Sequence, residues 1–530
     1  MKYFKFICLL LMNACVAGNT QAQAFFKFFG DSTQNQTLDG GIATDDGGYI
    51  LYGGYYVPAA GGKLASFLKT DAAGNLLWKK HLSFVNMEPR HIKSVVELPS
   101  HELMLFTQYQ NNFNYEGYLV IKTDSAGNVL WSKNYSFSNF ISRQVYRALL
   151  SNDGNILLGT TTGSVSSIYG EQTIYKLDTA GNIIWNNAFR SNGNGDDYLT
   201  AMAENSNSDI FIIGTRSAVV GGQSRPVLSK MDASSNVLWS KVFTDQMQVD
   251  DPVFSDILML PSGNIAVSGW ANEIPVVPTY PFVLEFDTAG TIVKTMKFKN
   301  STYSLSANSL AIDSAYNISL YGMMFTGNYN LWYMKCDSAG TVQYAHYLPF
   351  NAANYLNVNP GHNGSVMFTT SGNFNHYTWV ALKRDPATPF CQENTLILNY
   401  GTTLPLGINV NSLLTYNNTP TVINETAIVY TTANIVNDGC ITTGINPLTE
   451  SNAEVNFYPN PAQDYLLITT GKKINAIEIY NTAGVAIKDF ITSNLSNTMQ
   501  VNIKDLACGL YYIKVHSNNA LQTFRFFKTE

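Results

Sequence analysis

Two acidic pairs and two arginines are the residues of this chain whose types and places could bind or transform a ligand. The pairs are Asp196–Asp197 and Asp250–Asp251, each at the connection that enters an expected innermost strand of a repeat. Aligned on that repeat, the charges at one equivalent position are Arg90, Arg143 and Asp197, with Asp251 one residue away. Such carboxylates could act as acid and base on a glycan, or the charges could bind a ligand. The alternative is a set of solvated loop charges or local salt bridges.

Other catalytic chemistry is not indicated by the sequence. None of the histidines has the His-x-x-x-His spacing of a metal site. The chain also has neither a Gly-x-Ser-x-Gly nucleophile elbow nor a phosphate-binding loop. The seven histidines are His81, His91, His101, His346, His362, His376 and His516. We therefore expect neither a metal nor a cofactor, and we leave enzymatic activity open with a non-catalytic role favoured.

The composition favours a large protein built from strands and turns. With 530 residues, of which 45% are hydrophobic, the chain can form several domains' worth of core, which excludes wholesale disorder. The 32 Lys and Arg against 38 Asp and Glu give a net charge of −6, so no basic footprint for nucleic acid exists. The 31 Tyr, 29 Phe and 39 Gly favour strands and tight turns. Beyond the N-terminus, no apolar run is long enough to span a bilayer.

The N-terminus has the pattern of an export signal. Lys2 and Lys5 precede the apolar stretch Phe6–Met12, and small residues at Ala22 and Ala24 predict cleavage after residue 24. Cys15 raises the alternative of a lipoprotein, but the residues before it fit that pattern poorly. An exported chain enters an oxidising compartment. The four cysteines that remain are too few for disulfides to form the scaffold.

A repeat of about 53 residues dominates the chain up to residue 390. The segment Lys69–Trp78, with the sequence Lys-Thr-Asp-Ala-Ala-Gly-Asn-Leu-Leu-Trp, returns almost unchanged as Lys122–Trp131. A second motif, such as Asp46-Gly-Gly-Tyr-Ile-Leu-Tyr-Gly53, precedes each copy by about two dozen residues. The aspartates that mark seven copies of the first motif are Asp71, Asp124, Asp178, Asp232, Asp287, Asp337 and Asp385.

Each repeat predicts four short antiparallel strands, which is the signature of a propeller blade. In the first repeat the strands are expected near 38–44, 49–56, 64–70 and 75–82. The seventh repeat lacks an outer strand, because Pro386 and Pro389 follow Asp385. The segment Phe25–Phe29 has the pattern of the other outer strands. We therefore predict an all-β fold with a seven-bladed β-propeller over 25–390, closed by an N-terminal strand at 25–30 that removes an exposed sheet edge.

The Asp-x-x-Gly-Asn-x-x-Trp motif resembles the Asp-box hairpins of sialidase-type propellers, with one more residue between Asp and Gly. In those propellers the motif is a folding element away from the catalytic face. Calcium binding is the other interpretation, but one carboxylate a turn falls short of the six or more oxygens that calcium takes. Five turns, at Asp124, Asp178, Asp287, Asp313 and Asp337, continue with Ser-Ala or Thr-Ala. They resemble the O-glycosylation sites of exported Bacteroidetes proteins, or they serve turn chemistry alone.

After the repeats the composition becomes rich in Asn and Thr, with weak strand patterns. We expect residues 391–452 to be a linker with a small β region. Cys391 and Cys440 bracket this segment and are a candidate disulfide in an exported chain.

Residues 453–530 carry four blocks in a fixed order: Tyr458-Pro459-Asn460-Pro461, Ile477–Gly484, Ile503–Leu506 with Gly509–Val515, and Phe524–Lys528. This run resembles the type A C-terminal sorting domain of the type IX (Por) secretion system in Bacteroidetes. The resemblance implies partnership with that secretion machinery, export through the outer membrane after signal-peptide cleavage, and release or attachment at the cell surface. Its alternating apolar residues between turns predict a small antiparallel β-sandwich.

Two functions from different classes follow for the propeller. The first is a secreted or cell-surface binding and adhesion protein that presents one face to a glycan or another surface ligand. The second is a glycan-degrading enzyme with its site at the mouth of the propeller channel, and a purely structural surface protein is a further alternative. A propeller fold by itself implies no function.

Overall fold

The computed structural model describes most of the chain between residues 25 and 529. The described residues exclude 1–24, 385–393, 439–454, 530 and short gaps at 31–35, 58–61, 85–86, 112–113, 137–139, 165–169, 192–194, 218–223, 246–251, 273–277, 349–351, 361–365, 375, 402–405, 411–412, 417–420, 426, 431–434, 461, 482–485, 508 and 518–519. Within the described part every regular element is a strand, and no helix is long and apolar enough to cross a membrane. The chain divides into two units, Met1–Cys440 and Ile441–Glu530, which are described separately.

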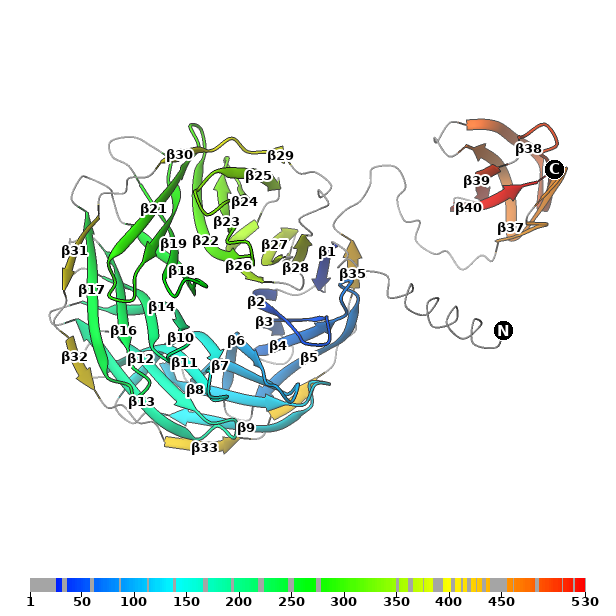
Figure 1. Cartoon of the computed structure of the whole chain (residues 1–530). Helices are drawn as coiled ribbons and strands as arrows, with labels where there is room; N and C mark the ends of the chain where they lie inside the picture. The colour runs from blue at the N-terminus through cyan, green and yellow to red at the C-terminus, as the bar shows by residue number, and fades with distance from the viewer. Residues whose placement is uncertain are drawn as a thin grey trace, which may run out of the picture. The chain divides into compact units, whose positions relative to one another are not determined.

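The first unit is an all-β propeller, as the repeat predicts (Figure 1). Six repeats each supply four consecutive antiparallel strands to one sheet. The first blade has β2 (Gln36–Ala43), β3 (Tyr49–Val57), β4 (Gly62–Thr70) and β5 (Leu76–Phe84). The second and third blades have β6 (Glu88–Glu97), β7 (Leu103–Asn111), β8 (Asn114–Thr123), β9 (Val129–Ser136), β10 (Phe140–Leu150), β11 (Ile156–Ser164), β12 (Gly170–Leu177) and β13 (Ile183–Ser191).

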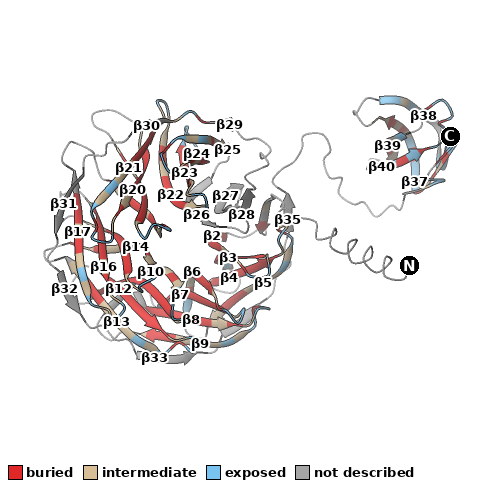
Figure 2. Cartoon of the chain, viewed as in Figure 1, coloured by how far each residue is buried: buried red, intermediate tan, exposed pale blue. Residues whose placement is uncertain are grey.

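The fourth to sixth blades continue the same order along the chain. Their strands are β14 (Asp197–Glu204), β15 (Ile210–Arg216), β16 (Arg225–Met231), β17 (Val237–Asp245), β18 (Val253–Met259), β19 (Ile265–Ala271), β20 (Tyr280–Phe286), β21 (Ile292–Lys299), β22 (Ser304–Ile312), β23 (Ile318–Phe325), β24 (Tyr329–Cys336) and β25 (Val342–Leu348). The innermost strands of successive blades, from β2 to β22, lie next to one another. The middle strands are buried on both faces, which forms an apolar core between each pair of blades (Figure 2).

One further sheet is a composite of distant segments, so the structure has six complete single-repeat blades and not the seven blades that the sequence predicts. It contains β26 (Ala352–Pro360), β27 (Val366–Phe374) and β28 (His376–Arg384), followed by the N-terminal strand β1 (Phe25–Gly30). Strand β1 pairs antiparallel with β28, with Phe25 opposite Lys383 and Phe29 opposite Trp379. Strand β26 lies next to both β2 and β22. The strand expected at 25–30 therefore lies beside the last repeat.

The segment expected to be a linker with a small β region adds a fifth strand to every propeller sheet. Seven short strands pair with the outermost strands along the outside of the propeller (Figure 1). They are β29 (Asn394–Thr395), β30 (Asn399–Gly401), β31 (Leu406–Val410), β32 (Leu413–Tyr416), β33 (Thr421–Glu425), β34 (Ala427–Tyr430) and β35 (Ile435–Asp438). These strands can form there because an unpaired outer edge offers backbone donors and acceptors to an extended chain. Cys391 and Cys440, the candidate disulfide, lie outside the described residues.

In five of the six single-repeat blades, an ion pair joins the two sequence motifs of the repeat. In the first blade the Lys69 Nζ lies 2.7 Å from the Asp46 Oδ1, which connects the end of β4 to the β2–β3 turn. Equivalent pairs in four other blades are Lys122–Glu102, Lys176–Asp153, Lys230–Asp209 and Lys335–Asp313. In the fifth blade, Glu285 replaces the lysine, and a hydrogen bond replaces the ion pair: the Asn264 side chain donates to the Glu285 carboxylate at 2.7 Å. Both motifs therefore serve the blade itself.

The aspartate turn also has a structural role. The Asp71 Oδ1 accepts hydrogen bonds from the backbone N–H groups of Ala73 and Asn75 at 2.9 and 2.8 Å, and the Asn75 side chain donates to Oδ2. The turn glycine packs under the tryptophan of the preceding blade, so a Cβ at Gly127 would lie 2.9 Å from the Trp78 ring. These contacts favour the folding interpretation of the motif over calcium binding.

The second unit has one curled antiparallel sheet where the sequence predicts a two-sheet sandwich. Its strands are β36 (Val455–Tyr458), β37 (Tyr465–Tyr480), β38 (Ala486–Asn502), β39 (Gly509–Ser517) and β40 (Ala520–Lys528). The order is β36-β37-β39-β40, and β38 pairs with β37. Because β37 is 16 residues long, it pairs with different partners in its two halves and needs no second sheet. Leu466, Ile477, Ile513 and Phe526 share its fully buried core.

Candidate functional site

The innermost strands of the six single-repeat blades share an irregularity that places polar side chains at the centre of the propeller. Each of β2, β6, β10, β14, β18 and β22 has a register shift where it pairs with the next strand. A β-bulge bends the strand and redirects the side chains at it, and such bulges concentrate near functional sites. The residues at or directly after these shifts include Asp39, Lys93, Arg147, Asp256 and Ser309.

The first polar cluster joins β2 to β6. The Asp39 Oδ1 lies 2.5 Å from the Lys93 Nζ, and its Oδ2 lies 3.0 Å from the His91 Nδ1. The Thr37 hydroxyl is 2.8 Å from the same imidazole nitrogen. Burial by itself would raise the pKa of Asp39, but the attraction of Lys93 and His91 lowers it below the usual value. This carboxylate is therefore ionised and held by the Lys93 ammonium.

The second polar cluster spans three blades. The Arg147 Nη1 on β10 donates to the Asp256 Oδ1 on β18 at 2.7 Å, although the β14 blade lies between them. The Asp256 Oδ2 accepts hydrogen bonds from the Ser309 hydroxyl at 2.6 Å and the Leu310 backbone N–H at 3.2 Å on β22. The Asp256 side chain is 10% exposed, whereas that of Arg147 is 41% exposed. Asp256 therefore anchors one nitrogen of an arginine side chain that is partly exposed.

Tyr52, on β3, lies close enough to both clusters for their charges to act on its phenol. Its side chain reaches under Gly40, where an added Cβ would lie 2.3 Å from the phenol oxygen. Burial raises the pKa of the Tyr52 phenol strongly, with smaller contributions from Arg147, which lowers it, and Asp39, which raises it. A glycosidase needs one carboxyl group with a raised pKa to donate a proton. The described carboxylates of these clusters are bound to cations, so the arrangement suits recognition of a ligand better than proton transfer.

The four residues selected from the sequence have different surroundings. Arg90 lies on β6 and contributes, after burial, to the lowered pKa of Lys63 on β4. Asp197 is buried at the start of β14, opposite Arg216. Arg143 is on β10, but its side chain is not described, and Asp251 lies outside the described residues. In the ring of innermost strands, β10 separates Arg90 from Asp197.

Residues next to the selected positions make structural contacts or belong to the central clusters. Asp196, the partner of Asp197 in the acidic pair, accepts hydrogen bonds from the Gly170 backbone N–H and the Tyr198 hydroxyl, so it connects two strands of adjacent blades. The charged residues of the two central clusters lie a few positions further along the innermost strands. The repeat alignment could have shown that polar residues recur there, but the bulge that redirects them has no sequence signature.

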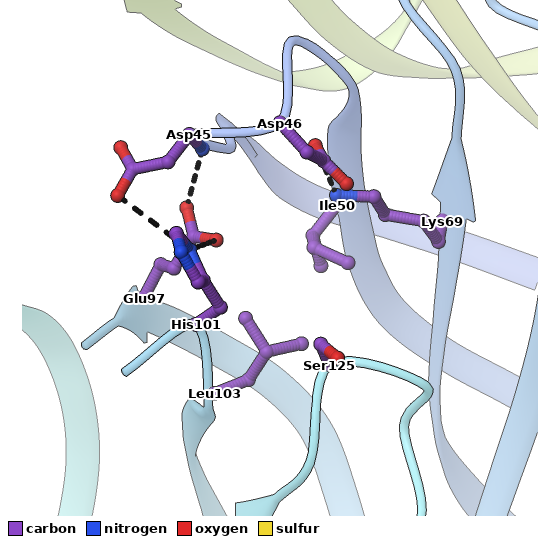
Figure 3. Close-up of a pocket in the computed structure, with 8 residues that line it drawn as sticks. All are labelled: Asp45, Asp46, Ile50, Lys69, Glu97, His101, Leu103 and Ser125. Atoms are coloured by element: carbon purple, nitrogen blue, oxygen red, sulfur yellow. Dashed lines mark hydrogen bonds and ion pairs between the residues drawn. The ribbon is translucent and has the colours of Figure 1, made fainter. Parts of the chain in front are cut away.

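A pocket of about 370 Å³ lies on the turn side of the first two blades (Figure 3). Figure 3 shows its two groups of charges: the Asp46–Lys69 pair, and a cluster of Asp45, Glu97 and His101. One ligand atom from each member of this cluster lies within 4.8 Å of the others, so the three could hold a cation. The sequence did not indicate this set, because only Glu97 and His101 are near one another in the chain, and Asp45 comes from another blade.

Part of this cluster has a structural explanation. The Glu97 Oε2 accepts a hydrogen bond from the Asp45 backbone N–H at 2.8 Å. Glu204 makes the same contact with the Asn152 backbone N–H at 2.8 Å, between the third and fourth blades. A glutamate at this position therefore caps the turn of the preceding blade, with or without a histidine nearby.

The expected glycosylation positions lie on exposed turns. Their hydroxyl residues are Ser125, Thr179, Thr288, Ser314 and Ser338, and all five are exposed. The turns that carry them follow the strand ends where the ion pairs of the repeats form.

The Tyr458–Pro461 motif holds the last strand of the second unit. The Asn460 side-chain oxygen accepts a hydrogen bond from the Phe527 backbone N–H at 3.0 Å, and Ala462 exchanges backbone hydrogen bonds with Phe527 and Thr529. Tyr458 is exposed, and its peptide bond to Pro459 is cis. Gly509 begins β39, whereas Pro461 and Gly484 lie outside the described residues.

Comparison with protein families identifies the second unit. Residues 456–528 match the secretion system C-terminal sorting domain. The chain therefore carries the type IX sorting domain that the four sequence blocks predicted, and this domain implies transport to the cell surface or outside the cell. A comparison with curated proteins found no match.

Several solved structures are similar to the chain at low identity. One is an alpha-L-arabinanase of Penicillium chrysogenum in complex with arabinobiose (11% identity, 55% of this chain and 91% of that chain, TM-score 0.34). Another is PorZ of Porphyromonas gingivalis, described as an essential surface component of the type-IX secretion system (11% identity, 93% and 81%, TM-score 0.30). A third is Drosophila Semaphorin 1a, extracellular domains 1–2 (9% identity, 69% and 89%, TM-score 0.41).

Proposed function

We propose that this protein is a type IX-exported binding protein whose propeller recognises a ligand in its centre. In this proposal residues 1–24 are removed as a signal peptide, the sorting domain at 453–530 directs passage through the outer membrane, and the propeller remains at the surface or is released. The six single-repeat blades and the composite sheet then form a closed ring of seven. The described contacts between successive innermost strands, including β26 with β2 and β22, support this closure.

The observation that carries the binding proposal is the guanidinium of Arg147. Asp256 fixes one of its nitrogens, while 41% of the side chain is exposed. A guanidinium presents several donors in a planar fork that matches a carboxylate or another oxyanion. A ligand that carries a carboxylate, such as an acidic oligosaccharide, would therefore add hydrogen bonds without displacing Asp256. The cation-bound state of Asp39 supports binding over glycan hydrolysis.

The test is a titration of the mature chain, residues 25–530, with oligosaccharides of galacturonic acid and with neutral galactose oligosaccharides of the same length. We expect the chain to bind the acidic series alone. In Arg147→Ala the dissociation constant should rise about 10- to 100-fold, because hydrogen bonds to a charged group are lost. Arg190→Ala is the matched control, because Arg190 also faces a carboxylate, Glu171, but on an outer strand. Equal affinity of both series, or an equal loss in both variants, would contradict the proposal.

Export is tested separately. A chain ending at residue 452 should remain behind the outer membrane, since it lacks the sorting domain. Surface display of this truncation at the normal level would refute the route. Turnover of either oligosaccharide series by the intact chain would instead support the enzymatic alternative.

A further inference from the structure

The fifth strands of the propeller follow one another around it in the reverse of blade order. Strand β29 pairs with β25 of the sixth blade, and β30 to β34 then pair with the outermost strands of the fifth to the first blade in turn. The last strand, β35, pairs with β1 of the composite sheet. One segment of 45 residues, 394–438, therefore visits all seven sheets once. We call it the strap.

The strap pairs with the propeller sheets through the backbone of very short strands. Its strands have two to five residues each, too few to be stable as separate elements. They persist because each is connected to neighbours that are already docked, which gives a high effective concentration at the next edge. Side chains anchor the first part: Leu396 is 5% exposed within the core of the fifth and sixth blades, and its N–H donates to the Ala345 carbonyl at 2.8 Å.

The last strand of the strap, β35, differs from the others because it pairs with the N-terminal strand β1. Strand β1 pairs with β28 on one side and with β35 on the other, where Lys27 is opposite Asp438 and Gly30 is opposite Ile435. Strand β1 has only six residues. Without β35 it would become an edge strand that is held from one side alone. Among the described sheets, this is the only one assembled from three distant parts of the chain.

We propose that residues 394–438 are a locking strap that seals the propeller last and detaches from its β35 end first. Releasing an internal strap strand leaves a loop with both ends fixed. β35 is the last described strand of the first unit, so among the described strands its release leaves a segment fixed at its β34 end alone, which gains more conformational entropy. The buried Leu396 holds the opposite end. The composite sheet is thus sealed only in a chain that is complete to Asp438, and its opening exposes β1 before any other strand. This inference is independent of ligand binding in the centre.

Hydrogen exchange on the mature chain tests the order of opening. Amide exchange measured at increasing denaturant below the unfolding transition gives an opening free energy for each strand. We expect β35 and β1 to open together at the lowest value, β34 next, and β29 last among the strap strands. A single common value for β29 to β35, or opening of β29 before β35, would overturn the proposal.

Two proline variants of the full chain separate the lock from general loosening. Proline removes a backbone donor and cannot serve a ladder. Val436→Pro disrupts β35, and Tyr400→Pro makes the same change in β30, which does not contact β1. We expect β1 amides to exchange about tenfold faster in Val436→Pro and to remain within about twofold of the parent in Tyr400→Pro. Unchanged β1 exchange in Val436→Pro would refute the lock, and if either variant fails to fold, the opening order in the parent chain decides.

Discussion

A single methyl group added at Gly127 tests how neighbouring blades are joined. Gly127 is in the aspartate turn of the second blade at φ +74°, and an added Cβ would lie 2.9 and 3.0 Å from two carbons of the Trp78 ring in the first blade. Gly154 has nearly the same backbone conformation, φ +81°, but a Cβ there would meet nothing within 4 Å. The two positions therefore differ in their surroundings and hardly in their backbone.

The expected magnitudes follow from this difference. Alanine in the left-handed region costs about 1–2 kcal/mol at either position. At Gly127 the tryptophan ring must also move, and such overpacking costs about 1–3 kcal/mol more. We therefore expect Gly154→Ala to lower the free energy of unfolding by about 1–2 kcal/mol and Gly127→Ala by about 2–5 kcal/mol. The same contact recurs at Gly181 with Trp131 and at Gly290 with Trp239.

The assay is chemical denaturation of the mature chain, read by tryptophan fluorescence and compared through transition midpoints. A double-mutant cycle with Trp78→Ala isolates the contact, because without the ring the extra cost at Gly127 should vanish and leave the backbone term alone. Equal costs for Gly127→Ala and Gly154→Ala would refute the reasoning. An excess that persists in the Trp78→Ala background would place the strain elsewhere.

Three further predictions concern the central clusters and the sorting domain. Because the folded-state pKa of Asp39 lies below its unfolded value, its ionised form stabilises the fold above the unfolded pKa, and this contribution is lost as the pH falls through the folded pKa. In urea titrations, the difference in unfolding free energy between the parent chain and Asp39→Asn should therefore be constant at neutral pH and shrink below about pH 4. A difference that does not change with pH would contradict this prediction. Asp256→Ala leaves the donors on β22 and Arg147 without their acceptor, so it should lower the free energy of unfolding by about 3 kcal/mol. Asp505→Ala removes only an exposed ion pair and should leave the unfolding midpoint nearly unchanged. Similar shifts in the two variants would show that Asp256 is not an anchor. Asn460→Ala removes the hydrogen bond that the Phe527 N–H donates to the Asn460 side chain. Losing about 1 kcal/mol should make the amides of β40 exchange about fivefold faster, while the amides of β2 to β25 should keep their exchange rates. Equal acceleration in both units would argue against a local role.

Most of the blade architecture could be predicted because its causes are local. The turn formed by Asp71 and Asn75 uses residues within five positions of one another, and the strands beside it have alternating or continuous apolar patterns. The strand expected at 49–56 is β3, and the strand expected at 75–82 is β5. Similarly, Asn460 and the blocks that follow it identified the sorting domain from short motifs.

The candidate site was harder to predict because it depends on contacts between distant residues. Arg147 and Asp256 are 109 positions apart and meet across an intervening blade. Repeat alignment selected the right strands but not the residues of the clusters: Arg90 lies at the first register shift of β6, whereas the cluster residue Lys93 lies at the second. Bulges are backbone events in the pairing of two strands, so a single strand's sequence does not reveal them.

The sequence by itself determined the repeat, the order of strands within each blade, the turns, and the sorting domain, because each depends on residues close together in the chain. Only the tertiary structure decided that residues 394–438 return around the propeller, that β35 covers β1, and that Asp39 and Asp256 are each neutralised by a cation from another blade. The strap pairs through backbone groups, which every residue type but proline supplies, so its sequence carries little trace of its partners. The charge clusters form only when the blades bring their innermost strands together.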